Sequence, residues 1–242
     1  MPYRKLDPAR IIDTAKTLSA RVAERFPDSG LSKIAAEMVS LARDTETTAA
    51  ELERPIWWLR ALVLLVVGAG MLVFIFVGTF LSFDRMSSAA FDLVQGIEAA
   101  INMIVLLGLG MFTLVNLEER FKRRRVLKSL HGLRSIIHVI DMHQLTKDPV
   151  VFSRDFKPTA SSPKRVMGAP DLKRYLDYCS ELLSLSGKLA ALHAQSVNDR
   201  DVVESVNDIE NLAANLSRKI WQKIAMIDEG GPRRGSRTGN IA

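Results

Sequence analysis

The sequence predicts an all-helical integral membrane protein, in which a two-helix transmembrane hairpin anchors a cytoplasmic helical bundle of coiled-coil-like character. Two runs without any charged residue, 61–83 and 99–117, predict the hairpin. Apolar residues spaced alternately by three and four positions, on both sides of these runs, predict the bundle. The chain has 242 residues and a formal net charge of +6. Its single cysteine, Cys179, excludes an intrachain disulfide framework and a multi-cysteine metal site.

The order of these patterns divides the chain into segments. We expect N-terminal amphipathic helices, then the hairpin, then a cytoplasmic extension of its second span, a loop rich in Pro and Ser, an antiparallel helical hairpin, and a disordered basic tail. The corresponding ranges are 1–54, 55–117, 118–145, 146–170, 171–229 and 230–242.

Two helices are expected before the membrane. Asp7 is a candidate N-cap and Pro8 suits the first turn of a helix over 8–26. Its apolar positions are Ile11, Ala15, Leu18, Val22 and Phe26. A second helix over 31–53 carries a seven-residue pattern at Leu31, Ala35, Met38, Ala42, Thr45, Ala49 and Leu52. Because Ala and Thr bury little area, we expect this helix to need a neighbour.

The hairpin is expected to contain spans at about 58–83 and 94–117, joined by an external turn at about 84–93. Trp57 and Trp58 stand where an interfacial aromatic anchor is expected. The external turn contains only one basic residue, Arg85. A basic run follows the second span, at Arg120, Lys122, Arg123, Arg124, Arg125 and Lys128.

The basic run predicts both the orientation and a lipid contact. By the positive-inside rule, both termini face the cytoplasm, and a bacterial inner membrane fits this pattern. Clusters of four to eight cationic residues just inside a span are typical of contact with anionic lipid headgroups. Aromatic residues are sparse, at 7% of the chain, which argues against a base-stacking nucleic-acid module.

Three further seams are expected on the cytoplasmic side. The second span is expected to continue as a helix to Leu145, with Pro149 ending the pattern. Its apolar positions are Val126, Leu130, Leu133, Ile137 and Ile140. A helix from Asp171 carries two apolar stripes, one at Leu172, Leu176, Cys179, Leu183 and Ala190 and the other at Tyr175, Tyr178, Leu182, Leu185, Leu189 and Leu192. The last helix holds Val202, Val206, Ile209, Ala213, Leu216, Ile220 and Ile227, interrupted by Lys223.

Two groups of polar residues are candidate sites. Gln95, Glu98 and Asn102 share a helix face in the second span and suit an ion, a proton or a self-association contact, although solvation of Glu98 at the outer interface is the favoured interpretation. His131, His138 and Asp141 suit a metal or an acid–base pair. The favoured interpretation there is a packing network in which Asp141 orients His138. Cys179 is expected to be a buried small apolar residue.

These patterns favour a non-enzymatic scaffold or adaptor, in which the anchored bundle self-associates or recruits a helical protein. We expect no catalytic residue, cofactor or metal, and no nucleic-acid partner. The first alternative is an oligomeric channel or transporter component that uses the polar face of the second span. The second is a metal-dependent or signalling membrane sensor that uses His131, His138 and Asp141.

Overall fold

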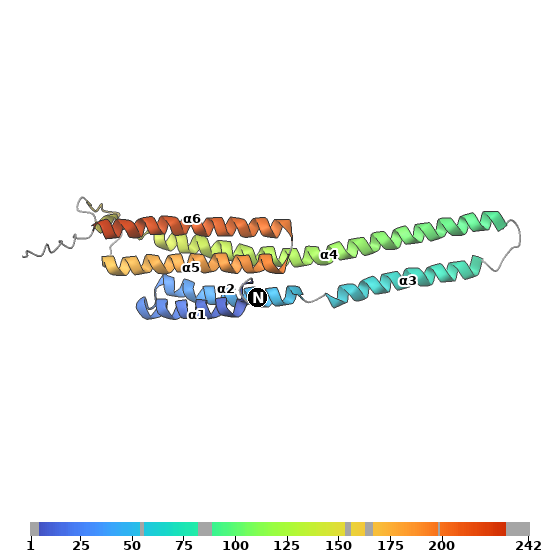
Figure 1. The fold of residues 1–242 in the computed structure, drawn as a ribbon, viewed down its shortest axis with the longest axis horizontal. Coiled ribbons are helices and arrows are strands. Elements are labelled where there is room, and N and C mark those ends of the chain that lie inside the picture. Colours follow the sequence, from blue (N-terminus) through green and yellow to red (C-terminus); the bar gives the residue numbers. More distant parts are fainter. Residues whose placement is uncertain are drawn as a thin grey trace, which may run out of the picture. The chain divides into compact units, whose positions relative to one another are not determined.

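The computed structural model describes residues 5–53, 56–81, 89–152, 156–162, 167–197 and 199–230. Within these ranges the protein is all-helical, as predicted, and contains no strand. Its helices are α1 (Pro8–Arg25), α2 (Gly30–Glu53), α3 (Trp57–Leu81), α4 (Ala89–Leu145), the short 3-10 helix η1 (Pro149–Phe152), α5 (Ala169–Ser196) and α6 (Arg200–Gly230) (Figure 1). The chain divides into two compact units, residues 1–52 with 125–242 and residues 53–124. Helix α4 contributes to both.

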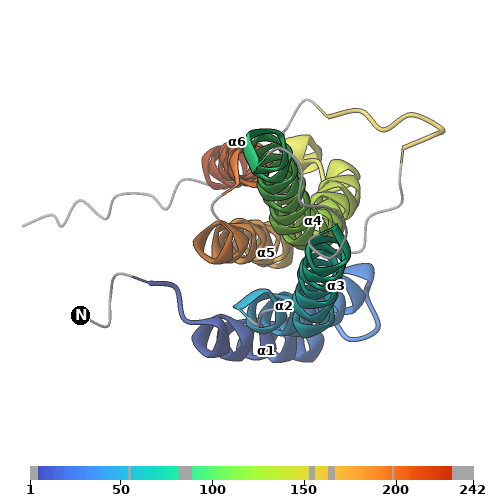
Figure 2. The same ribbon diagram turned by 90° about the vertical axis from the view of Figure 1, so that its right-hand side faces the viewer.

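The first unit, called the bundle below, consists of α1, α2, the second part of α4, α5 and α6. Their buried side chains form one apolar cluster. Helices α5 and α6 pair antiparallel, with Ser180 Oγ 2.6 Å from Ser217 Oγ and Gly187 beside Glu210 (Figure 1). Figure 2 shows the five segments end-on, with α1 and α2 on one side and α4, α5 and α6 on the other.

Helix α1 begins and packs as its sequence predicts. The Asp7 carboxylate accepts a hydrogen bond from Ala9 N–H at 3.0 Å and caps the first turn, with Pro8 following it. The five predicted apolar positions are all buried. At the end of the helix, the Phe26 ring makes edge-on contacts with Tyr175 and Tyr178 of α5, at centroid distances of 5.5 and 6.3 Å. This contact joins α1 to a segment far away in the sequence.

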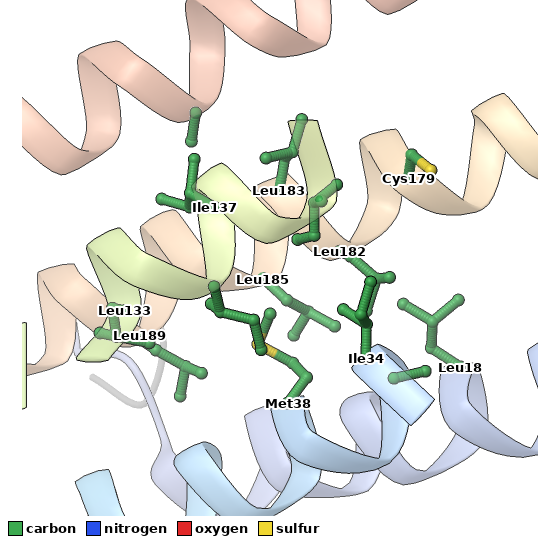
Figure 3. Packing of buried hydrophobic residues seen from close by; sticks show 14 of the residues in the cluster. Leu18, Ile34, Met38, Leu133, Ile137, Cys179, Leu182, Leu183, Leu185 and Leu189 are labelled. Carbon is green, nitrogen blue, oxygen red and sulfur yellow. The ribbon is translucent and has the colours of Figure 1, made fainter. Parts of the chain in front are cut away.

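Helix α2 shares the same core. Ser29 Oγ accepts a hydrogen bond from Ser32 N–H at 3.1 Å and so caps its start. All seven seam residues predicted for α2 are buried, including Thr45. In Figure 3, Ile34 and Met38 lie among leucines of α5, with Leu133 and Ile137 of α4 nearby. The neighbour that the thin seam of α2 requires is therefore the rest of the bundle.

The described parts of the segment after α4 contain a short helix and contacts with the core. Helix α4 ends at Leu145, and η1 starts at Pro149, which is buried. Phe152 and Met167 pack against the core. Helix α5 then starts at Ala169, slightly before the predicted Asp171, with a proline in its first turn. Parts of the predicted loop therefore help to close the end of the bundle.

The predicted interruption in α6 has a structural explanation. The apolar seam passes from Ile220 to Ile224 and on to Ile227, all of which are buried. Lys223 lies beside the seam and donates hydrogen bonds to the backbone oxygen of Gln144 at 3.1 Å and to its Oε1 at 2.6 Å. The lysine thus connects α6 with the end of α4.

The second unit, called the hairpin below, contains α3 and the first part of α4. Both helices are long and apolar enough to cross a membrane. The 25 residues of α3 extend about 37 Å at 1.5 Å per residue, which exceeds a hydrocarbon core of roughly 30 Å. Helix α4 starts at Ala89, so 89–93 is helical and does not belong to the predicted turn. Residues 84–88 of that turn, and the predicted tail beyond Gly230, lie outside the described residues.

Candidate functional site

Both helices of the hairpin expose large apolar side chains. Leu64, Ile104 and Phe112 are 72%, 69% and 67% exposed. They belong to a set on both helices that also includes Leu65, Leu72, Phe76, Val105, Leu106 and Leu109. Soluble monomers rarely expose contiguous apolar patches of this extent, and such patches are typical of membrane or protein contacts.

Trp57, Trp58 and Phe121 mark one end of the hairpin. Both tryptophans are exposed, and the Trp58 ring meets Phe121 of α4 edge-on at 6.4 Å. The carboxylate of Glu118 pairs with Lys122 at 3.0 Å. Burial acts to raise the pKa of Glu118, but hydrogen bonds from Lys122 and from the backbone of Ile56, with the nearby positive charges, lower it below its ordinary value. This end therefore combines exposed aromatic rings with a stably ionised ion pair.

The predicted basic run divides by helix face. Lys122 is held by Glu118, and Arg125 pairs with Glu51 of α2 at 2.8 Å within the bundle. Arg120, Arg124 and Lys128 are exposed and follow one another at four-residue spacing on α4. Arg123 is half-buried.

The predicted polar face of the second span is directed away from α3. Glu98 and Asn102 are both exposed, and the side chain of Gln95 lies outside the description. Helices α3 and α4 meet along another face, where a Cβ on Gly70 would lie 3.6 Å from Leu107 Cδ2. No described contact between the two helices of the hairpin uses Glu98 or Asn102.

The predicted histidine group lies along the second part of α4. His131 and His138 are exposed on α4. Asp141 accepts a hydrogen bond from Gln144 Nε2 at 2.6 Å, and no bond to His138 is found among the described residues. The described residues contain no group of three or more His, Cys, Asp or Glu side chains placed to hold a metal ion. The packing network instead joins α4 to α6 through Arg134–Asp208 at 3.2 Å and Gln144–Lys223.

A buried polar layer in the bundle was missed by the sequence reasoning. His193 of α5 is completely buried, and its Nε2 lies 2.9 Å from Ser129 Oγ of α4. Its Nδ1, and Oγ1 of the buried Thr45, have no hydrogen-bond partner among the described residues. Burial lowers the pKa of His193 to about 4.

Thr45 belongs to the same layer by register. Ser186 Oγ of α5 lies 3.9 Å from Met38 Sδ of α2. Thr45 follows Met38 by seven residues on α2, and His193 follows Ser186 by seven residues on α5. Because the two helices run parallel, this register places Thr45 opposite His193. A signal for His193 was present in the sequence, because Ser186 and His193 complete the four-three spacing of the stripe that contains Cys179. Cys179 itself is buried, as predicted, and burial raises its pKa to about 12.

The fold and the hairpin together define an all-helical protein with two candidate membrane spans. Comparison with known proteins adds no relative: no family model, curated protein or solved structure matches the chain.

Proposed function

We propose that this chain is an integral membrane protein whose hairpin anchors the bundle at the cytoplasmic face of a membrane, such as a bacterial inner membrane. The observation that carries the proposal is the exposure of large apolar side chains on both helices of the hairpin, with Leu64 and Ile104 about 70% exposed. In water this surface costs free energy at roughly 25 cal/mol per Å² of apolar area, whereas a bilayer removes that cost.

Aromatic and basic residues support the orientation. Trp57 and Trp58 are amphipathic rings at the start of α3, and Arg120 and Arg124 are exposed just after the second span. The sequence between the spans has one basic residue, Arg85. This asymmetry favours a cytoplasmic location for both termini.

The topology is tested by adding a single cysteine at Ser88 or at Lys33 and labelling intact cells with a membrane-impermeant maleimide. The wild type, with its buried Cys179, is the background control. We expect label at position 88 before permeabilisation and at position 33 only afterwards, with the protein retained in membranes through carbonate extraction. Release by carbonate, or label at position 33 in intact cells, would contradict the proposal.

Contact with anionic headgroups is a second part of the proposal. Arg120 and Arg124 lie on one face of α4 and are exposed. At about 1 kcal/mol per cation, losing both should weaken phosphatidylglycerol retention by roughly tenfold or more. Native mass spectrometry of the Arg120→Gln/Arg124→Gln variant measures how much phosphatidylglycerol it retains, with phosphatidylcholine as the comparison lipid. The matched control is Lys33→Gln/Arg200→Gln, which changes the charge equally at exposed bundle positions, and an equal loss in both pairs would contradict a local lipid site.

For the bundle we propose a scaffold or adaptor role, without chemistry of its own. Its interior is packed mainly with apolar side chains from five helical segments, so we propose that it acts through contacts at its surface. The role predicts self-association or capture of a helical protein. Crosslinking in native membranes followed by size analysis of the purified protein tests it, and a strict monomer without crosslinked species would argue against it.

A further inference from the structure

Helix α4 uses only one face to pack against α3. Among the described side chains of 94–112, the partly buried positions of α4 are Ala100, Met103, Leu107 and Gly110. The matching positions of α3 are Val63, Val67 and Gly70. The 3.6 Å separation between a Cβ on Gly70 and Leu107 Cδ2 places these two seams in contact. The opposite face of α4 is left for another occupant.

That opposite face carries a second seam. Residues spaced alternately by three and four positions run along it and are exposed where their side chains are described. They are Glu98, Asn102, Val105, Leu109 and Phe112, preceded by Gln95. At 100° per residue, Asn102 lies about 140° from Leu107 around the helix. A seven-residue repeat of this kind is the pattern by which two helices pack at a shallow crossing angle.

Asn102 is the residue that most needs a partner. It follows the start of α4 at Ala89 by about 20 Å at 1.5 Å per residue, inside the charge-free run 99–117. A carboxamide facing lipid leaves its N–H and C=O groups without hydrogen bonds. Two polar side chains lie deeper in this span. Thr113 differs because its hydroxyl donates to the Leu109 carbonyl at 2.8 Å, and Asn116 differs because it is half-buried and lies next to the inner end of the charge-free run.

We propose that a second copy of this chain docks on this seam, with Asn102 hydrogen-bonded to Asn102 of the other copy across a two-fold axis. A carboxamide both donates and accepts, so it is complementary to itself, as a symmetric contact requires. Val105, Leu109 and Phe112 pack below it, and Glu98 lies toward the outer end of the span. This inference rests on the proposed membrane hairpin, and it identifies a second copy of the chain as the partner of that hairpin.

The test uses full-length protein, labelled with a donor or an acceptor at Lys33→Cys and reconstituted in phosphatidylcholine vesicles at low protein-to-lipid ratio. We expect energy transfer between copies of the labelled Lys33→Cys protein, called the parent, and also between copies that additionally carry Thr113→Val. Asn102→Leu should weaken association by about tenfold, since interhelical polar contacts in membranes contribute on the order of 1–2 kcal/mol. Asn102→Leu makes the span more apolar, so insertion is retained and carbonate extraction of the same sample verifies it.

Disulfide formation tests the geometry independently. Leu109→Cys is expected to crosslink two copies in native membranes, whereas Met103→Cys, on the α3-facing seam, is not. Undiminished energy transfer in Asn102→Leu, or a Leu109→Cys crosslink only to a different protein, would overturn the inference. Absence of transfer in correctly inserted parent protein would overturn it while leaving the membrane proposal intact, and failure of the parent to insert would instead contradict that proposal.

Discussion

Nε2 of His193 lies 2.9 Å from Oγ of Ser129, in the interior of the bundle. The two residues are separated by 64 positions and come from α5 and α4. A neutral imidazole that donates from Nε2 leaves Nδ1 as an acceptor, and this tautomer is favoured because a buried acceptor without a partner costs less than a buried donor. The pair fixes the relative register of α4 and α5.

The first prediction concerns pH. Because the pKa of His193 is about 4 in the folded chain and about 6.5 when unfolded, protonation favours the unfolded state. The contribution of neutral His193 to the free energy of unfolding is therefore fully present above pH 6.5. It is lost as the pH falls toward 4, and the total loss is about 3 kcal/mol. Hydrogen exchange of α5 amides in the detergent-solubilised full chain measures it. His193→Gln should remove this component, while His138→Gln, at an exposed position, should retain it; identical profiles for all three proteins would contradict the assignment.

The second prediction concerns the hydrogen bond itself. Ser129→Ala leaves the imidazole donor unpaired in the core and should cost roughly 1–3 kcal/mol of unfolding free energy. With His193→Leu already present, the same change should cost much less, because no buried donor then remains. Denaturant unfolding of the four proteins of this double-mutant cycle gives the coupling. Simple additivity would mean that the two side chains do not interact.

Much of the core was predictable because packing follows helical periodicity. Leu31, Met38 and Ala42 were expected on one face of α2 from their spacing, and all are buried. The same holds for the seams of α1, α4, α5 and α6. Each of these predictions depends on local sequence alone, since a helix turns by 100° per residue whatever surrounds it.

The choice of neighbours was not predictable from periodicity. Arg21 of α1 donates to Glu181 of α5 at 2.9 Å across 160 positions, and its guanidinium lies 5.2 Å from the Tyr178 ring centroid. Nothing in the local pattern of either helix specifies that partner. The candidate site shows the same limit. Asp141 was expected to orient His138, but the hydrogen bond that it accepts comes from Gln144 Nε2, at 2.6 Å.

The third prediction uses a close approach between α2 and α4. A Cβ at Gly30 would overlap the imidazole of His143, whose Nδ1 lies 3.0 Å from the Val139 carbonyl oxygen. Gly30→Ala should therefore destabilise the bundle by about 1–3 kcal/mol, and His143→Ala should largely relieve the cost. The measurement is the free energy of unfolding in denaturant.

Gly132→Ala is the matched control for this prediction. Its Cβ would lie 3.6 Å from Leu41 Cδ2, an ordinary contact, so helix propensity should dominate and stabilise the protein by about 0.5–1 kcal/mol. If both alanine substitutions change stability equally, crowding by His143 is not the cause.

The fourth prediction concerns Cys179, which is fully buried and lies on α5, the helix that also carries Leu182 and Leu183 (Figure 3). Burial raises its pKa to about 12, so the reactive thiolate is scarce at pH 8, and the surrounding side chains exclude reagents. We expect modification by a thiol reagent to be at least roughly 100-fold slower than for a cysteine introduced at Ala225, an exposed position of α6. In denaturant the two rates should converge. Fast labelling of Cys179 in the native chain would mean that α5 separates readily from the bundle. The Ala225→Cys control gives the pH dependence of the reagent itself. If labelling of Cys179 is slow but, after this correction, accelerates below pH 6.5, the opening of the bundle is linked to protonation of His193.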